Sequence, residues 1–121
     1  MPVYPNVHEV LIALLSPIAT TVKAKRQGQP LPYNVVRRIG GAEDTITDRP
    51  IVRVDTYAHT DEQAEQIKES CRQRITDSGC TLVDGVLIDT VREITGGQDA
   101  PAPDPADRKQ TAVYQLSFRS I

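Results

Sequence analysis

The chain has 121 residues, of which 39% are hydrophobic and 25% are charged, proportions typical of one ordinary globular domain. The formal net charge is -2, from 14 basic and 16 acidic residues, so no overall field draws the protein onto nucleic acid or an anionic membrane. We expect a single domain over residues 1–121, too small to hold a catalytic domain beside a separate substrate domain.

The sequence indicates neither a membrane span nor a cysteine framework. The longest strongly apolar stretch, Val10–Leu15, is far shorter than the roughly 20 residues that cross a bilayer. The N-terminal residues do not follow the pattern of a signal peptide, so we expect no membrane partner. Cys71 and Cys80 have the spacing of neither a zinc site nor a redox motif, and we expect both to be buried free thiols.

The first predicted element is an amphipathic helix over residues 6–17. Asn6 is a good N-cap, Glu9 follows it as in a capping box, and Pro17 ends or bends the last turn. The apolar residues recur at helical spacing and form one broad stripe: Val7, Val10, Leu11, Leu14, Leu15 and Ile18.

Three strands are predicted to follow. Residues 20–26 alternate between apolar or small side chains and lysines, as expected of a half-exposed edge strand. Residues 33–39 are rich in β-forming side chains, and residues 51–58 alternate most clearly, with Val52 and Val54 on one face and Arg53 and Asp55 on the other. A long hairpin through Gly40 joins the last two strands.

A second helix and two strands complete the predicted order. Thr60 and Gln63 form a capping box, and a stripe of apolar residues at helical spacing leads to a stop at Gly79. Residues 82–95 form a strand with a possible turn at Asp84–Gly85, and the final strand alternates through Ala112, Tyr114, Leu116 and Phe118. The proline-rich segment 96–107 between them should be a mobile loop, flexible over about residues 96–109.

The predicted fold class is therefore α+β, in the order α-β-β-β-α-β-β. Each helix has a single apolar stripe and the strands offer alternating faces, so both helices should pack on one face of a mixed, largely antiparallel sheet. Leu11, Leu14, Val54, Ile67 and Leu116 should then share one core.

We find no pattern of residues typical of catalysis, of a cofactor or of a metal. His8 and His59 have no serine or cysteine beside them in a nucleophile motif, and a solvated role is favoured for both. The acidic residues Glu43, Asp44, Asp48 and Asp55 lack the spacing of a calcium loop or a metal-binding helix. The glycine pairs are turn glycines without the rest of a phosphate-binding motif. We therefore expect a protein that is not an enzyme.

Basic side chains supply the candidate interface. Arg37, Arg38, Arg49 and Arg53 cluster across the predicted long hairpin, either as a solvated face or as a subunit contact. Arg108 and Lys109, at the exit of the proline-rich loop, either are solvated or meet acidic groups of a neighbouring subunit.

Several stretches of the chain resemble the tail terminators of long-tailed (siphovirus) actinobacteriophages. They are residues 3–11 (VYPNVHEVL), 35–41 (VVRRIGG) and 46–57 (ITDRPIVRVDTY), with the proline-rich segment before the last strand. The resemblance to the lambda-type terminator family implies an α/β subunit that forms a homohexameric ring on the last ring of the tail tube. Such a ring stops tube polymerisation, presents a surface to the head–tail connector proteins and lets DNA pass without specific binding. The resemblance also implies a location at the tail end near the neck of the virion. Before assembly, the implied location of the subunit is the host cytoplasm.

Two alternatives stay open from the sequence. A head–tail connector or other neck protein of the same phage type has similar size and element order, and differs in the end of the virion that it binds. A small enzyme of unrecognised type would need a clustered nucleophile, base and ligand set, which the sequence does not offer.

Overall fold

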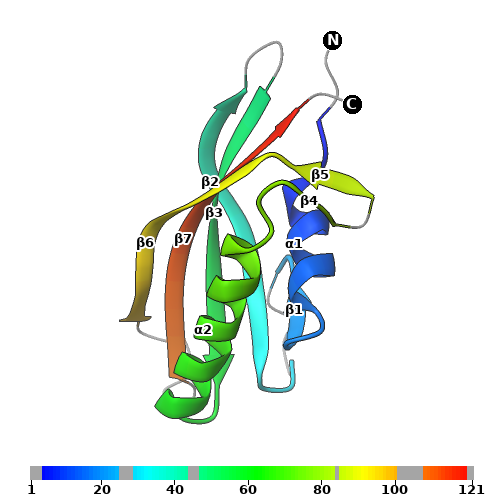
Figure 1. Ribbon diagram of the computed structural model, residues 1–121. Coiled ribbons are helices and arrows are strands. Elements are labelled where there is room, and N and C mark those ends of the chain that lie inside the picture. Colours follow the sequence, from blue (N-terminus) through cyan, green and yellow to red (C-terminus); the bar gives the residue numbers. More distant parts are fainter. Residues whose placement is uncertain (1–3, 25–28, 44–46, 84, 101–107, 120–121) are drawn as a thin grey trace.

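The computed structural model describes residues 4–24, 29–43, 47–83, 85–100 and 108–119. The elements in chain order are α1 (Val7–Leu15), β1 (Thr20–Val22), β2 (Tyr33–Glu43), β3 (Thr47–Ala58), α2 (Asp61–Thr76), β4 (Thr81–Val83), β5 (Val86–Ile88), β6 (Thr90–Ala100) and β7 (Arg108–Arg119). Two helices and a mixed sheet confirm the predicted α+β class (Figure 1).

The main sheet has five strands in the order β1-β2-β3-β7-β6, and β4 and β5 form a separate two-stranded sheet. The pairs β2–β3, β3–β7 and β6–β7 are antiparallel, while the short β1 runs parallel to β2. The long hairpin predicted to join the second and third strands is thus present as β2 and β3. Because β7 inserts between β3 and β6, the C-terminal strand is central and not an edge (Figure 1).

The predicted strand at residues 82–95 is wrong in one respect, because three strands occupy this region. β4 and β5 form a hairpin in which Val83 pairs with Val86, and Gly85 has a φ of 76°, which favours glycine. The chain then enters β6 at Thr90 and changes from the small sheet to the main one. The turn predicted before Val86 marks the first break, whereas the run Val86–Val91 gives no signal of the second break, between β5 and β6.

The predicted loop is also shorter than expected. Gly96 and its neighbours up to Ala100 belong to β6, and Arg108 and Lys109 already belong to β7. The register of β6 against β7 shifts between Thr95 and Gln98, so the two glycines are accommodated as a bulge in a strand. The rest of the predicted mobile segment, residues 101–107, lies outside the described residues, as do residues 25–26 of the first predicted strand.

Both helices begin at the predicted caps. The Asn6 side chain accepts a hydrogen bond from the backbone N–H of His8 at 3.0 Å, and Thr60 Oγ1 accepts one from the N–H of Gln63 at 3.1 Å. Gln63 Oε1 in turn accepts from the N–H of His59 at 3.1 Å, which completes a capping arrangement. The two helices end at Leu15 and Thr76, slightly before the predicted stops. Neither described helix has the length and apolar character needed to cross a membrane.

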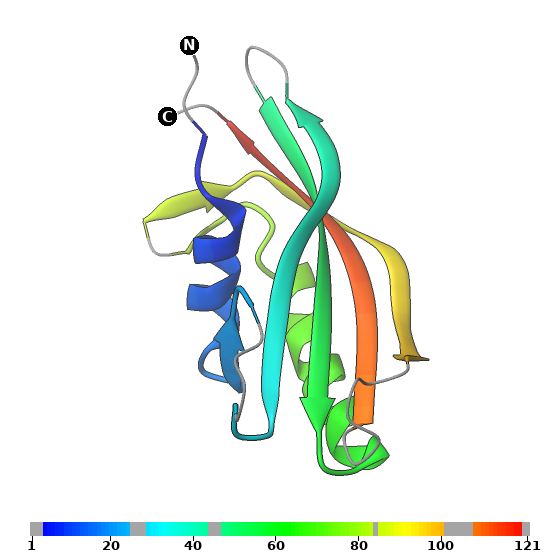
Figure 2. The ribbon, with the colours of Figure 1, turned by 180° about the vertical axis from the view of Figure 1, so that it is seen from behind.

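One core joins both helices to the same face of the sheet. Its buried residues come from α1, α2 and the strands β2, β3, β5 and β7, and they include Leu11, Leu14, Val54, Leu116 and Phe118, with Ile67 packed against them. The predicted single core is confirmed. The rear view shows the opposite face of the sheet, with α2 lying behind the strands (Figure 2).

The two cysteines differ, contrary to the expectation that both are buried. Cys71 is 1% exposed on the core side of α2, and burial raises its pKa to about 11. Cys80 is exposed, at a φ of 60° in the turn before β4. Cys80 follows the end of the helix, so the helical periodicity that places Cys71 in the core does not extend to it.

Leu11 and Leu82 provide a matched test of the core. Leu11 is 0% exposed and Leu82 is 71% exposed. Leu11→Ala should lower the free energy of unfolding by about 2–5 kcal/mol because it leaves a cavity among packed side chains. Leu82→Ala removes the same atoms and should change it by less than about 0.5 kcal/mol. Urea denaturation of dilute protein measures both, and equal losses would contradict the assigned core.

Candidate interaction surface

Strand alternation gives the sheet a core face and an open face. Val52 and Val54 of β3 point to the helices, so Arg53 between them and Asp55 after them point the other way. On β2, Val36 lies in the core and Arg37 next to it is exposed. The described helices do not cover the open face (Figure 2). The open face is therefore a surface on which candidate arginines can meet a partner.

A buried carboxylate organises the middle of the open face. Asp55 is only 3% exposed. One of its oxygens accepts a hydrogen bond from Thr111 Oγ1 at 2.7 Å, and the other accepts one from Arg53 Nε at 3.2 Å. Lys109 Nζ lies 3.9 Å from the same carboxylate and 5.5 Å from the centre of the Tyr57 ring. Two of the candidate cations, Arg53 and Lys109, therefore compensate a buried charge within their own subunit.

An apolar cluster lies beside this network on the open face. Tyr33 and Tyr57 pair across β2 and β3, and their rings stack with centroids 4.8 Å apart and planes inclined by 13°. Val35 is buried with them, and Val22 and Leu31 pack against the cluster. The open face is thus ordered by packing as well as by charge.

Arg38 is also engaged inside its subunit. Its guanidinium forms a bidentate ion pair with Asp48, with distances of 3.0 and 2.9 Å, and its Nε donates to the backbone oxygen of Gly40 at 3.1 Å. Asp48 is 2% exposed. The pair links β2 to β3 where the register shifts between Arg38 and Gly40. Arg38 therefore stabilises a β-bulge rather than a flat strand.

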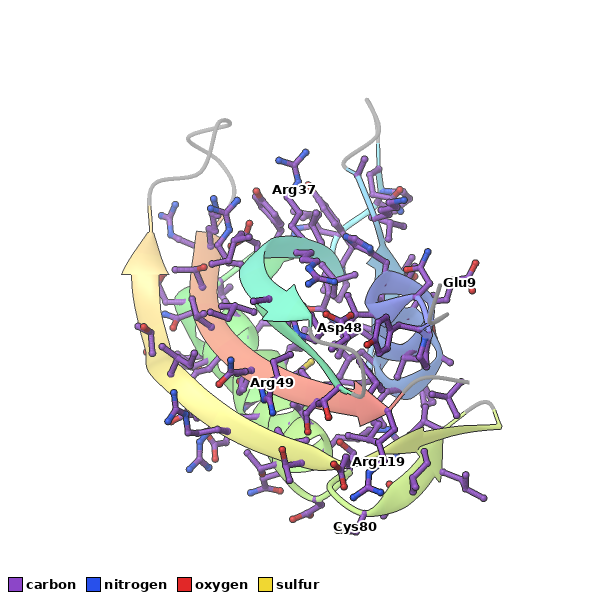
Figure 3. The ribbon with its side chains drawn as sticks, turned by 90° about the horizontal axis from the view of Figure 1, so that it is seen from above. Glu9, Arg37, Asp48, Arg49, Cys80 and Arg119 are labelled. Carbon is purple, nitrogen blue, oxygen red and sulfur yellow. The ribbon has the colours of Figure 1, made fainter. Side chains whose placement is uncertain are left out.

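The other three candidates lie at separate places. Arg37 is exposed, pairs in register with Arg53 and points away from both helices (Figure 3). Arg49 lines a hollow of about 380 Å³ together with residues of β6 and β7. Arg108 Nε lies 3.5 Å from Asp61 at the start of α2, an exposed pair of small energetic value. The six predicted residues do not form one patch, although Arg37 and Arg53 do lie side by side.

The structure adds a basic hollow that the sequence did not predict. His8, Lys23, Arg37 and Arg38 line a space of about 350 Å³ with Ala24, at the outer edge of β2 beyond the end of β1. We call these four residues the basic hollow. The backbone N–H of Arg38 donates a hydrogen bond to His8 Nε2 at 3.2 Å, so Nε2 is an acceptor and carries no proton. Burial, and then the charges of Lys23 and Arg38, lower the pKa of His8.

The described part of the chain contains no grouping of His, Cys, Asp or Glu that could hold a metal. Asp48 and Asp55 lie at positions of opposite alternation on β3 and have different basic partners, Arg38 and Arg53. Of the other two acidic residues considered from the sequence, Glu43 ends β2 and Asp44 is outside the described residues.

A family model described as phage tail termination protein matches residues 3–120. The chain belongs to the phage tail termination family. Its members are structural virion proteins, so this member of the family has a structural role in the phage tail and is not an enzyme.

The fold is shared with a solved virion structure. A chain in the structure described as the virion of the native gene transfer agent (GTA) particle superimposes with a TM-score of 0.63 at 8% sequence identity, covering 88% of this chain and 85% of that one. At this identity the likeness shows the fold alone. No curated protein sequence matches the chain.

His8 provides a pH test of the basic hollow. Because its pKa is lowered in the folded protein, the unfolded chain binds the proton first, and stability present near neutral pH should be lost as the pH falls below the ordinary histidine value of about 6.5. His8→Gln keeps an acceptor that does not titrate and should flatten this loss, as measured by urea denaturation at several pH values. The exposed His59, changed to Gln, is the matched control. The same slope in wild type and His8→Gln would contradict the assignment.

Proposed function

We propose that the chain closes as a ring of six copies on the last ring of the tail tube and ends tube polymerisation there. The observation that supports this most directly is the family match, which extends over residues 3–120 and names tail termination. Six copies of a 13.3 kDa chain give a ring of about 80 kDa. The resemblance of residues 3–11, 35–41 and 46–57 to terminators of actinobacterial siphophages supports the lambda-type ring in particular.

The architecture supports a ring that closes on itself. A cyclic ring needs a heterologous interface, in which one surface of a subunit binds a different surface of its neighbour. The main sheet ends in two unlike edges, the short β1 beside β2 on one side and the long β6 on the other (Figure 1). We propose that residues 1–121 form one domain, so that each subunit presents both edges of the sheet.

The remaining surfaces serve the partners above and below the ring. We propose the tail tube protein on one side and the head–tail connector proteins on the other, at the tail end near the neck, after the subunit has been made in the host cytoplasm. DNA passes through the ring without specific binding, and the formal net charge of -2 supports this because each cation–phosphate contact would add salt-sensitive affinity. The connector alternative shares these properties, but the family match favours termination.

Tail length tests the function. Tails assembled without this protein should have tubes of variable and greater length, because nothing ends polymerisation, and addition of the protein should restore a uniform length. Electron microscopy of negatively stained tails measures the length distribution.

A neck connector gives a different result in the same experiment. Tails lacking a connector would keep their normal length and fail only to join heads. Normal, uniform tube length in the absence of this protein would therefore contradict termination.

A further inference from the structure

The basic hollow lies at one edge of the sheet and includes cations that form no ion pair with the described residues. Lys23 and Arg37 are exposed, and neither has an ion-pair partner among the described residues. Ile39, next to Arg38 at the same edge, is the residue skipped in the register shift of β2, and it is 51% exposed. This edge of the molecule therefore combines positive charge with an exposed apolar side chain.

The opposite edge has the complementary properties. Glu62, Glu65, Glu69 and Arg72 recur at helical spacing on one side of α2, and we call the three glutamates the acidic stripe. This side borders β6, because Arg72 pairs with Glu69 at 3.1 Å and with Glu93 of β6 at 2.7 Å. Glu62 and Glu65 are exposed and have no ion-pair partner among the described residues.

The register shifts at the two edges are level with each other. Arg38 pairs with Val52, Val52 with Tyr114, and Tyr114 with Glu93, so one row of residues crosses the four long strands from the basic edge to the acidic edge. The register of β6 shifts just after Glu93, as that of β2 does just after Arg38. The skipped residue is again an isoleucine, Ile94, which is 43% exposed.

We propose that these edges form the ring interface, with the basic hollow and Ile39 of one copy against the acidic stripe and Ile94 of the next. The occupant of the basic hollow is thus a second copy of this chain, an assignment that rests on the proposed ring. Charge complementarity fixes which edges meet, since two basic or two acidic edges repel. The two surfaces differ and lie on opposite sides of the subunit, as a heterologous contact requires.

Charge reversal tests the interface. Arg37→Glu or Glu65→Arg each places like charges in every contact, and each should raise the protein concentration needed for half-assembly of rings by at least about tenfold. The double variant Arg37→Glu/Glu65→Arg restores opposite charges in every contact and should recover most of the assembly. Native mass spectrometry over a range of concentrations measures rings and monomers, and circular dichroism verifies that each variant is folded.

Asp77→Arg is the matched control, because Asp77 is exposed at the end of α2 away from both edges and the charge change equals that of Glu65→Arg. It should assemble like wild type. Rings of wild-type stability from folded Arg37→Glu protein, or no recovery in the double variant, would overturn the interface while leaving the proposed function intact. A wild-type protein that stays monomeric at the highest concentration and on tube ends would overturn the ring itself.

Discussion

Two helices cover one face of a five-stranded sheet, and most other features of the subunit depend on this imbalance. The covered face holds the main core, so its central strand positions are apolar and its helices have single buried stripes. The other face and both edges remain for polar networks and for partners. A structural tail protein needs such uncovered surface, because its role is performed by contacts with other subunits.

Buried carboxylates decide which basic residues are available for those contacts. Asp48 and Asp55 are almost fully buried, and a buried charge without a partner is strongly destabilising. Arg38 and Arg53 are therefore committed to their own subunit, and Lys109 contributes to the same compensation. Arg37 has no such carboxylate among the described residues, although it neighbours both arginines, which makes it the candidate cation best placed to bind a neighbouring copy.

The sequence predicted the features that local periodicity encodes. The caps at Asn6 and Thr60, the shared core and the burial of Cys71 all follow from the spacing of apolar and capping residues. Strand pairing carries no such local signal, so the break between β5 and β6 and the bulges of β2 and β6 were not predicted, whereas the turn before Val86 was. The candidate arginines were chosen by type and proximity in the chain, whereas their partners are set by register across strands. The basic hollow joins residues from α1, the segment after β1, and β2, and only the fold brings them together.

Copies of this chain are expected to close around the end of the tail tube. A cryo-electron microscopy reconstruction of the head-proximal end of assembled tails tests this arrangement most directly, because the subunit fold can be placed in the density without further labelling. We expect one closed ring of six subunits there, with the outer edge of β2 in each copy facing β6 and α2 of the next. Density showing this subunit at another position in the virion, or as a single copy, would contradict it.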